Sequence, residues 1–157
     1  MERIIRKATA ADTAKVMDII RRTKFFRPVE ETIAQEVLDD AVTDASYQSF
    51  VIEANGRVAG WVCFGQTPCT LGTFDIYWIA VDPTVQHGGL GSALLTFAEK
   101  QIAAQNGRLM IIETSGSEMY RLTQKFYTKN GYHLAASVDD FYAPGDPKLI
   151  FTKVVQR

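Results

Sequence analysis

The chain has 157 residues, enough for one domain with a sizeable core, and 46% of them are hydrophobic against 22% charged. Its 17 basic and 18 acidic residues give a formal net charge of −1, which argues against nucleic acid as the main partner. No apolar run reaches membrane-spanning length, and we expect no signal peptide. The composition therefore predicts one domain over residues 1–157, located in the cytoplasm, with Cys63 and Cys69 as free thiols.

Apolar periodicity and turn residues predict alternating elements along the chain. Seven strands are expected, at residues 4–7, 47–53, 57–64, 73–81, 108–113, 132–138 and 149–155. Four helices are expected, capped by Thr9, beginning near Pro28, and spanning 92–104 and 118–129. The resulting order is β-α-α-β-β-β-α-β-α-β-β.

Local patterns also predict which side chains are buried. The pair Asn55-Gly56 between two apolar runs predicts a β-hairpin turn. The second helix is expected to bury one stripe of side chains spaced by four residues, namely Val29, Ile33 and Val37. The last helix is expected to bury Met119, Leu122 and Phe126, with Tyr120 and Tyr127 on another face. Two prolines and a glycine predict that residues 139–148 form the loop between the last two strands.

The most informative segment joins the strand at 73–81 to the helix at 92–104. It reads Val81-Asp82-Pro83-Thr84-Val85-Gln86-His87-Gly88-Gly89-Leu90-Gly91-Ser92. Glycines at such a turn permit positive φ and allow a ligand to approach the main chain closely. The following helix start offers N–H groups without helical partners and the positive end of the helix dipole. The segment therefore predicts an anion site, usually one for phosphate.

Three kinds of phosphate loop compete for this segment. A P-loop requires Lys followed by Ser or Thr after its last glycine. Here Ser92-Ala93 follow Gly91, so the segment is not a P-loop. A dinucleotide fingerprint has Leu94 at its third small position, although Glu113 stands roughly where a ribose-binding carboxylate is expected. The third pattern, Gln/Arg-x-x-Gly-x-Gly/Ala, is met at every fixed position by residues 86–91.

This third pattern resembles the acyl-CoA pyrophosphate loop of the Gcn5-related N-acetyltransferase (GNAT) superfamily. A second segment, Phe126-Tyr127-Thr128-Lys129-Asn130-Gly131-Tyr132, resembles that family's Phe/Tyr-Tyr-x-x-x-Gly-Phe/Tyr motif. The order of elements is also similar to that of the family, so the resemblance covers nearly the whole chain. It implies an α/β (α+β mixed) fold, in which helices flank a central mixed sheet.

The resemblance further implies acetyl-CoA as co-substrate, with no metal, and assigns roles to individual residues. Cofactor binding is assigned to Ile79, Ala80, Val81, Gln86, His87, Gly88, Gly89, Leu90, Gly91, Ser92 and Tyr120. Tyr120 stands where the family often has an asparagine that contacts the pantetheine arm. The backbone around Ile79 and Ala80 would stabilise the oxyanion.

Acyl transfer to an amine also needs proton donors and acceptors. Tyr127 corresponds to a tyrosine near the CoA sulfur and is the candidate acid, on the premise of an unperturbed pKa of about 10. Asp75 and Glu113, which lie on the strands beside the loop, are candidate bases, and a chain of water molecules stays open as an alternative.

The sequence therefore predicts an N-acetyltransferase that transfers the acetyl group directly, in a ternary complex, to a primary amine of a small molecule, amino acid or peptide. A protein N-terminus or lysine stays open as the acceptor, and so does a homodimer. No nucleic acid or membrane partner is expected. Two alternatives stay open, a non-catalytic CoA-binding domain and a dinucleotide-binding oxidoreductase.

Overall fold

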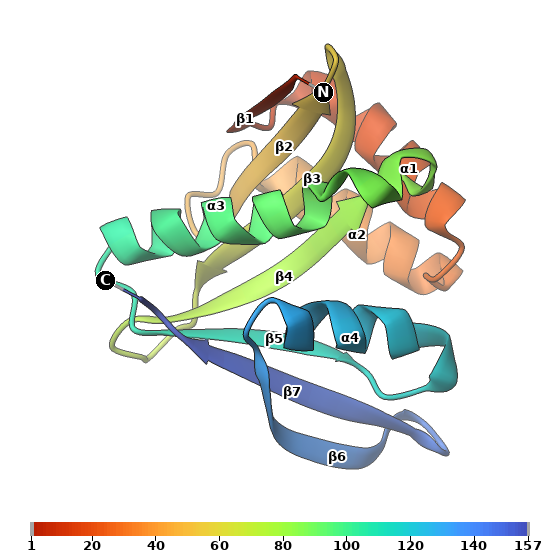
Figure 1. Cartoon of the computed structure of the whole chain (residues 1–157), viewed down its shortest axis with the longest axis vertical. Coiled ribbons are helices and arrows are strands. Elements are labelled where there is room, and N and C mark those ends of the chain that lie inside the picture. Colours follow the sequence, from red (N-terminus) through yellow and green to blue (C-terminus); the bar gives the residue numbers. More distant parts are fainter. Residues whose placement is uncertain (1, 157) are drawn as a thin grey trace. The chain divides into compact units, whose positions relative to one another are not determined.

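The computed structural model describes residues 2–156, apart from the side chains of Gln86 and His87. Seven strands and four α-helices follow one another there in the predicted order (Figure 1). The strands are β1 (Arg3–Lys7), β2 (Gln48–Ala54), β3 (Arg57–Gln66), β4 (Thr73–Val81), β5 (Leu109–Ser115), β6 (His133–Ala143) and β7 (Asp146–Val154). The helices are α1 (Thr13–Thr23), α2 (Pro28–Asp40), α3 (Leu90–Ala104) and α4 (Arg121–Lys129), with short 3₁₀ helices η1 (Ala10–Asp12), η2 (Pro83–Gly88) and η3 (Glu118–Tyr120).

The strands form one mixed sheet with the order β1-β2-β3-β4-β5-β7-β6. Strands β4 and β5 run parallel, with Thr73 opposite Leu109 and Asp75 opposite Ile111. The neighbouring pairs β1–β2, β2–β3, β5–β7 and β6–β7 are antiparallel. The predicted fold class, a mixed sheet with flanking helices, is confirmed.

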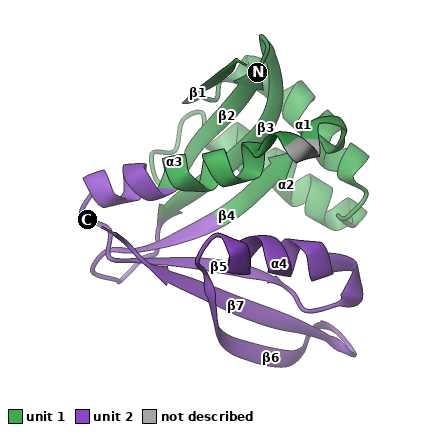
Figure 2. Cartoon of the chain, in the orientation of Figure 1, with its two compact units in different colours: residues 1–65, 77–98 green, residues 66–76, 99–157 purple. Residues whose placement is uncertain are grey.

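The chain divides into two compact units (Figure 2). Unit 1 comprises Met1–Gly65 and Tyr77–Ala98, and unit 2 comprises Gln66–Ile76 and Glu99–Arg157. Strand β4 and helix α3 each contribute residues to both units. The expectation of a single domain over residues 1–157 stays a prediction.

In unit 1, helices cover both faces of strands β2 and β3 (Figure 1). Helices α1 and α2 pack on the face that carries Val51, Trp61 and Cys63, which belong to one buried cluster with both helices. The opposite face meets α3, where the rings of Phe50 and Phe97 lie 4.8 Å apart. Successive strand residues point to opposite faces, so alternate residues supply the two cores.

The buried face of α2 differs from the predicted one. The residues of α2 that lie in the core are Ala34 and Leu38, whereas Val29 and Ile33 are exposed. Residues four apart are rotated by about 40° around a helix of 3.6 residues per turn, so the stripe from Val29 to Val37 drifts across the surface. Only its last member, Val37, packs against the cluster.

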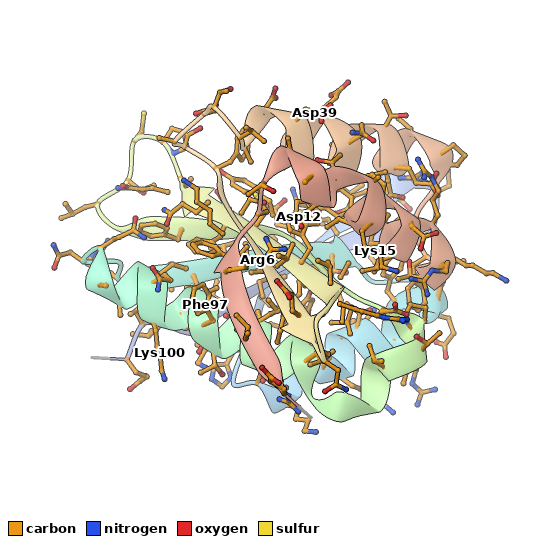
Figure 3. The ribbon with its side chains drawn as sticks, turned by 90° about the horizontal axis from the view of Figure 1, so that it is seen from above. Arg6, Asp12, Lys15, Asp39, Phe97 and Lys100 are labelled. Atoms are coloured by element: carbon orange, nitrogen blue, oxygen red, sulfur yellow. The ribbon has the colours of Figure 1, made fainter. Side chains whose placement is uncertain are left out.

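An ion-pair network ties the first strand to the first helix. Arg6 of β1 donates through Nη1 to Asp12 Oδ2 at 2.9 Å and through Nε to Glu53 Oε2 at 2.5 Å (Figure 3 labels Arg6 and Asp12). Asp12 also accepts the backbone N–H of Thr9 at 2.8 Å. Thr9 thus occupies the predicted N-cap position of η1, and the capping bond recorded there is made by the side chain of Asp12. The hydrogen bonds from Arg6 lower the pKa of the Asp12 carboxyl below its usual value.

In unit 2, helix α4 buries a different side chain from those predicted. Tyr127 is buried, whereas Met119 is 62% and Leu122 74% exposed. The Tyr127 ring packs at 5.8 Å from Phe151 of β7 and at 6.2 Å from Tyr132, measured between ring centroids. The aromatic partners on the sheet therefore select Tyr127 as the core residue of this helix.

The connection between the last two strands is also shorter than predicted. Strand β6 extends to Ala143 and β7 begins at Asp146, so most of residues 139–148 lie in strands, although the register is irregular between Val138 and Ala143. The turn is made by Pro144 and Gly145, and Gly145 has φ of +78°. Proline is tolerated near the start of a strand, which is where Pro147 lies.

Within residues 2–156 no helix combines the length and apolar character needed to cross a membrane. Among the side chains that the structure describes, no group of three or more His, Cys, Asp or Glu is placed to bind a metal ion. Cys63 is buried and Cys69 exposed, and both are free thiols, as predicted.

Candidate functional site

The glycine-rich segment of unit 1 has the backbone geometry of an anion site. Gly88 ends η2, and Gly89 follows in the left-handed region with φ of +71°. Such a right-handed to left-handed succession turns consecutive N–H groups toward one point, a concavity that binds anions. Helix α3 begins directly afterwards at Leu90, two residues earlier than predicted.

The first turn of α3 adds further donors. The first backbone bond into this helix runs from Ala93 N–H to Gly89 O at 3.1 Å. The N–H groups of Leu90, Gly91 and Ser92 precede that bond and have no acceptor within the helix. The Leu90 side chain is fully buried and anchors the turn. These N–H groups and the helix dipole favour a phosphate at this position.

An ion pair holds the beginning of the segment to α1. Arg22 donates to both oxygens of Asp82, at 2.8 and 2.9 Å. Asp82 Oδ1 also accepts the Thr84 N–H at 2.9 Å and the Thr84 hydroxyl at 2.8 Å, so it caps η2. Hydrogen bonding from Arg22 holds the pKa of the Asp82 carboxyl well below its usual range. The carboxylate stays charged at neutral pH and fixes where the loop starts.

The three strand residues before the loop differ in what they offer a ligand. Ala80 is buried in the core cluster of α1 and α2, so only its backbone is available. Ile79 and Val81 are half-buried. The Asp82 N–H donates to Ala59 O of β3 at 2.8 Å, which fixes the end of β4. The oxyanion role of this backbone stays a prediction.

Tyr127, the candidate acid, lies in the aromatic core of unit 2. Among the described residues, no hydrogen bond to the Tyr127 hydroxyl is found. Every fully buried side-chain N or O atom of those residues has a hydrogen-bond partner. Burial raises the pKa of the Tyr127 hydroxyl above its usual value, so the premise of an unperturbed pKa was wrong. The phenol therefore stays protonated across the physiological range. Tyr120 ends η3, occupies the N-cap position of α4 and is half-buried.

Both candidate bases already have partners. Asp75 Oδ2 accepts a hydrogen bond from the Thr67 hydroxyl at 2.6 Å. Glu113 is exposed, and its Oε2 lies 2.6 Å from Lys148 Nζ. The Lys148 ammonium also lies 4.2 Å from the centroid of the Phe141 ring. The ion pair with Lys148 occupies the Oε2 atom of Glu113, so an amine would have to displace the lysine there, and Glu113 is the poorer candidate.

Unit 2 carries the predicted acid and both predicted bases, but the sheet separates them. Asp75 lies opposite Ile111 across the β4–β5 ladder, and Glu113 follows two residues further along β5, so both carboxylates belong to one face. Tyr127 packs on Phe151, which lies opposite Ile112 in the β5–β7 ladder and therefore belongs to the other face. The residues of the glycine-rich segment and of the end of β4 belong to unit 1. Gln86 and His87, which are also assigned to cofactor binding, have side chains outside the described residues.

Sequence reasoning missed the charged residues that hold the loop. Arg22 lies far outside the glycine-rich segment, and its partner Asp82 is 60 residues away along the chain. Arg3 of β1 donates to the carbonyl oxygen of Gly88, 85 residues away. Nothing in the local sequence pairs residues over such separations, so only the fold reveals these contacts.

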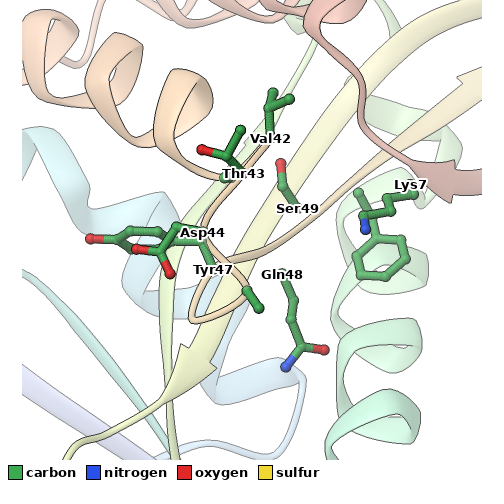
Figure 4. A pocket seen from close by; sticks show the side chains of 10 residues that line it. Lys7, Val42, Thr43, Asp44, Tyr47, Gln48 and Ser49 are labelled. Carbon is green, nitrogen blue, oxygen red and sulfur yellow. The ribbon is translucent and has the colours of Figure 1, made fainter.

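Unit 1 also contains a cavity of about 280 Å³ away from these residues (Figure 4). It is lined by Lys7 and by residues between Ala41 and Phe50, which connect α2 to β2 and begin β2. None of the predicted site residues whose side chains are described lines this cavity.

The family profile described as the acetyltransferase (GNAT) domain matches residues 45–134. The chain belongs to this family. The predicted family and fold are therefore both confirmed.

Three known proteins illustrate the similarity. A protein from Desulfovibrio desulfuricans, assigned to the acetyltransferases of the GNAT family, has a crystal structure that matches with a TM-score of 0.94 at 36% identity, covering 99% of this chain and 100% of that one. An aminoglycoside 6'-N-acetyltransferase solved with coenzyme A matches with a TM-score of 0.77 at 14% identity, covering 98% of both chains, and shows the shared fold alone. The S-(2-succino)cysteine N-acetyltransferase of Bacillus subtilis is 25% identical over 87 residues, which is 53% of each chain. The match thus spans about half the length of this curated relative.

Proposed function

We propose that this protein is an N-acetyltransferase that transfers the acetyl group of acetyl-CoA directly to a primary amine in a ternary complex. The observation that carries the proposal is the glycine-rich segment at the start of α3. There, the left-handed Gly89 and the N–H groups of Leu90, Gly91 and Ser92 suit the cofactor's pyrophosphate. Membership in the GNAT family supports acetyl-CoA as the anion-bearing ligand.

In the proposed reaction the amine nitrogen attacks the thioester carbonyl carbon. The carbon–sulfur bond then breaks, and CoA leaves as a thiolate that takes up a proton. Tyr127 is our candidate donor because it matches the family's tyrosine near the CoA sulfur. Burial raises the pKa of its hydroxyl, which keeps it protonated but makes it a weaker acid toward the thiolate. The amine proton passes to water or to a carboxylate, for which Asp75 is a better candidate than the lysine-paired Glu113.

Deacylation of the cofactor also generates a charged intermediate. The tetrahedral adduct places a negative charge on the former carbonyl oxygen, and preorganised N–H groups stabilise such a charge. We assign this role to the backbone of β4 around Ile79 and Ala80. Because the Ala80 side chain is buried in the core, its backbone is held firmly by the packing.

For the acceptor we favour a small amine or an amino acid. The Bacillus subtilis relative is named for acting on a substituted cysteine, which is an amino acid derivative. The near-neutral charge of this chain gives no reason to favour a strongly basic peptide tail. A peptide N-terminus and a lysine side chain are the competing acceptors.

Calorimetric titration with acetyl-CoA, compared with NADH and NADPH, tests the cofactor. We expect saturable binding of acetyl-CoA alone, weakened in Gly89→Val because a β-branched residue is strained at φ of +71°. Gly56→Val is the matched control, since Gly56 has φ of +81° with open space around it at the hairpin turn. Equal loss in both variants, or a preference for NADH, would contradict the proposed cofactor.

Turnover then distinguishes an enzyme from a binding domain. Release of the CoA thiol is measured with a panel of amino acids, other small amines and peptides. An acceptor that accelerates thiol release identifies the substrate class. Tight acetyl-CoA binding without acceleration by any amine would instead favour the non-catalytic CoA-binding domain.

A further inference from the structure

Arg3 of strand β1 reaches the loop that we assign to the cofactor phosphates. Its guanidinium donates to the carbonyl oxygen of Gly88. Its two terminal nitrogens also lie 3.8 and 3.9 Å from the position that a Cβ on Gly89 would occupy. Among the described residues no carboxylate pairs with Arg3, so this backbone carbonyl is its principal acceptor.

The base of Arg3 is fixed by the neighbouring hairpin. Arg3 lies opposite Ala54 in the β1–β2 ladder. The preceding residue, Glu2, donates its N–H to Asn55 Oδ1 at 3.2 Å and accepts the Asn55 N–H at 3.0 Å. The Arg3 side chain therefore extends to Gly88 from a backbone that is paired with β2 and held to the hairpin turn through Asn55.

A hydrogen bond to the Gly88 carbonyl sets the direction of the next amide. In a planar trans peptide, the carbonyl of one residue and the N–H of the next point in opposite directions. While Arg3 holds the Gly88 carbonyl on its side, the Gly89 N–H must point away from Arg3. A glycine pair has no side chains to enforce this orientation and would otherwise sample several.

We propose that Arg3 is a positioning residue for the pyrophosphate of CoA. It acts through the Gly88–Gly89 peptide, whose N–H it aims toward the phosphate position, and not by direct contact with the ligand. This inference rests on the proposed function. It extends the site to a strand that neither the glycine-rich motif nor the family resemblance assigns to cofactor binding.

The first test uses three ligands that differ in their phosphates. CoA carries the pyrophosphate and a 3′-phosphate, dephospho-CoA keeps only the pyrophosphate, and pantetheine has neither. In Arg3→Met we expect the Kd of CoA and of dephospho-CoA to rise equally, by about tenfold, the scale of one lost hydrogen bond from a charged donor. The Kd of pantetheine should not change. Arg57→Met is the matched control, because Arg57 is exposed at the beginning of β3 and, among the described residues, no hydrogen bond or ion pair joins its side chain to the loop.

Each other result overturns the inference. A loss confined to CoA would mean that Arg3 contacts the 3′-phosphate directly. An equal loss for pantetheine would mean that the substitution disturbs the protein as a whole. Unchanged affinity for all three ligands would mean that the loop keeps its orientation without Arg3.

A second measurement requires no ligand and separates this inference from the proposed function. In the ¹⁵N-labelled ligand-free protein, Arg3→Met should shift or broaden the amide resonances of Gly88, Gly89 and Leu90, whereas Arg57→Met should leave them unchanged. Failure of the wild-type protein to bind CoA would refute the proposed function. Unchanged loop amides in Arg3→Met would refute the positioning role, whatever the wild type binds.

Discussion

The ion pair between Arg22 and Asp82 should stabilise unit 1, and replacing Asp82 by Asn tests this. Asparagine keeps an oxygen that accepts the Thr84 N–H, so the cap of η2 survives. The change removes the negative charge and one of the two acceptors that Arg22 uses, at 2.8 and 2.9 Å. It therefore isolates the ion pair from the cap.

The expected loss follows from the exposure of the two partners. Hydrogen bonds to charged groups are worth about 1.5–3 kcal/mol each. The Asp82 side chain is only 11% exposed, but that of Arg22 is 34% exposed and recovers part of its hydration. We therefore expect Asp82→Asn to lower the free energy of unfolding by about 2 kcal/mol. Asp82→Ala should cost about 1 kcal/mol more, because it also removes the cap.

Urea denaturation followed by tryptophan fluorescence is the assay. The only two tryptophans of the chain, Trp61 and Trp78, both belong to unit 1, so the signal reports on that unit. The control is Asp18→Asn, because the exposed Asp18 pairs with the same arginine at 2.9 Å and should contribute less than about 0.5 kcal/mol.

A double-mutant cycle with Arg22→Met decides whether the pair itself is responsible. If the ion pair stabilises the unit, the double variant should lose less than the sum of the two single losses, by about 1 kcal/mol. Additive losses, within about 0.3 kcal/mol, would refute the reasoning and mean that each residue acts through other contacts.

The effect of Asp82 should also depend on pH. Its pKa is lowered in the folded protein, so its stabilising contribution is fully present above the unfolded-state pKa of about 3.9 and is lost as the pH falls below it. The difference between wild type and Asp82→Asn should therefore be constant from pH 7 to about 5 and should shrink below about pH 4. A difference that persists undiminished in acid would contradict a charge-based contribution.

Two further predictions concern single side chains. Tyr127→Phe keeps the ring that packs on Phe151, so the free energy of unfolding should be almost unchanged. The release of the CoA thiol should slow by about a hundredfold. Full turnover of this variant between pH 6 and 9 would refute the role of Tyr127 as the acid. Cys69 should react with a thiol reagent at once and Cys63 only after unfolding, because Cys63 is buried and burial raises the pKa of its thiol to about 12. Equal reaction rates of the two thiols in the native protein would contradict this burial.

The elements that the sequence predicted well depend on local chemistry. Asn55 and Gly56 both have positive φ, at 52° and 81°, as the predicted two-residue hairpin turn requires. Strand β4 has the predicted bounds because an apolar run ends there at Asp82 and Pro83. The glycine-rich segment was recognised for the same reason, since its spacing is local.

The two errors about buried helix faces arose where a helix has apolar residues on more than one face. Helix α4 has only nine residues, and its pattern offers either Leu122 or Tyr127 to the sheet. Phe151 and Tyr132 decide between them, and both lie outside the helix. A pattern within one helix cannot contain that information, because the partner surface is assembled from other strands.

The segment from Asp82 to Gly89 is held at both ends by arginines from other elements. Arg22 of α1 binds the carboxylate of Asp82 at its beginning, and Arg3 of β1 binds the carbonyl of Gly88 near its end. A glycine-rich loop that must become ordered on binding loses affinity through the entropy of ordering, whereas a loop ordered beforehand does not. Under the proposed function, the two arginines explain how a segment that ends in two glycines would present fixed N–H groups to a phosphate, and why the motif alone would not be the complete site.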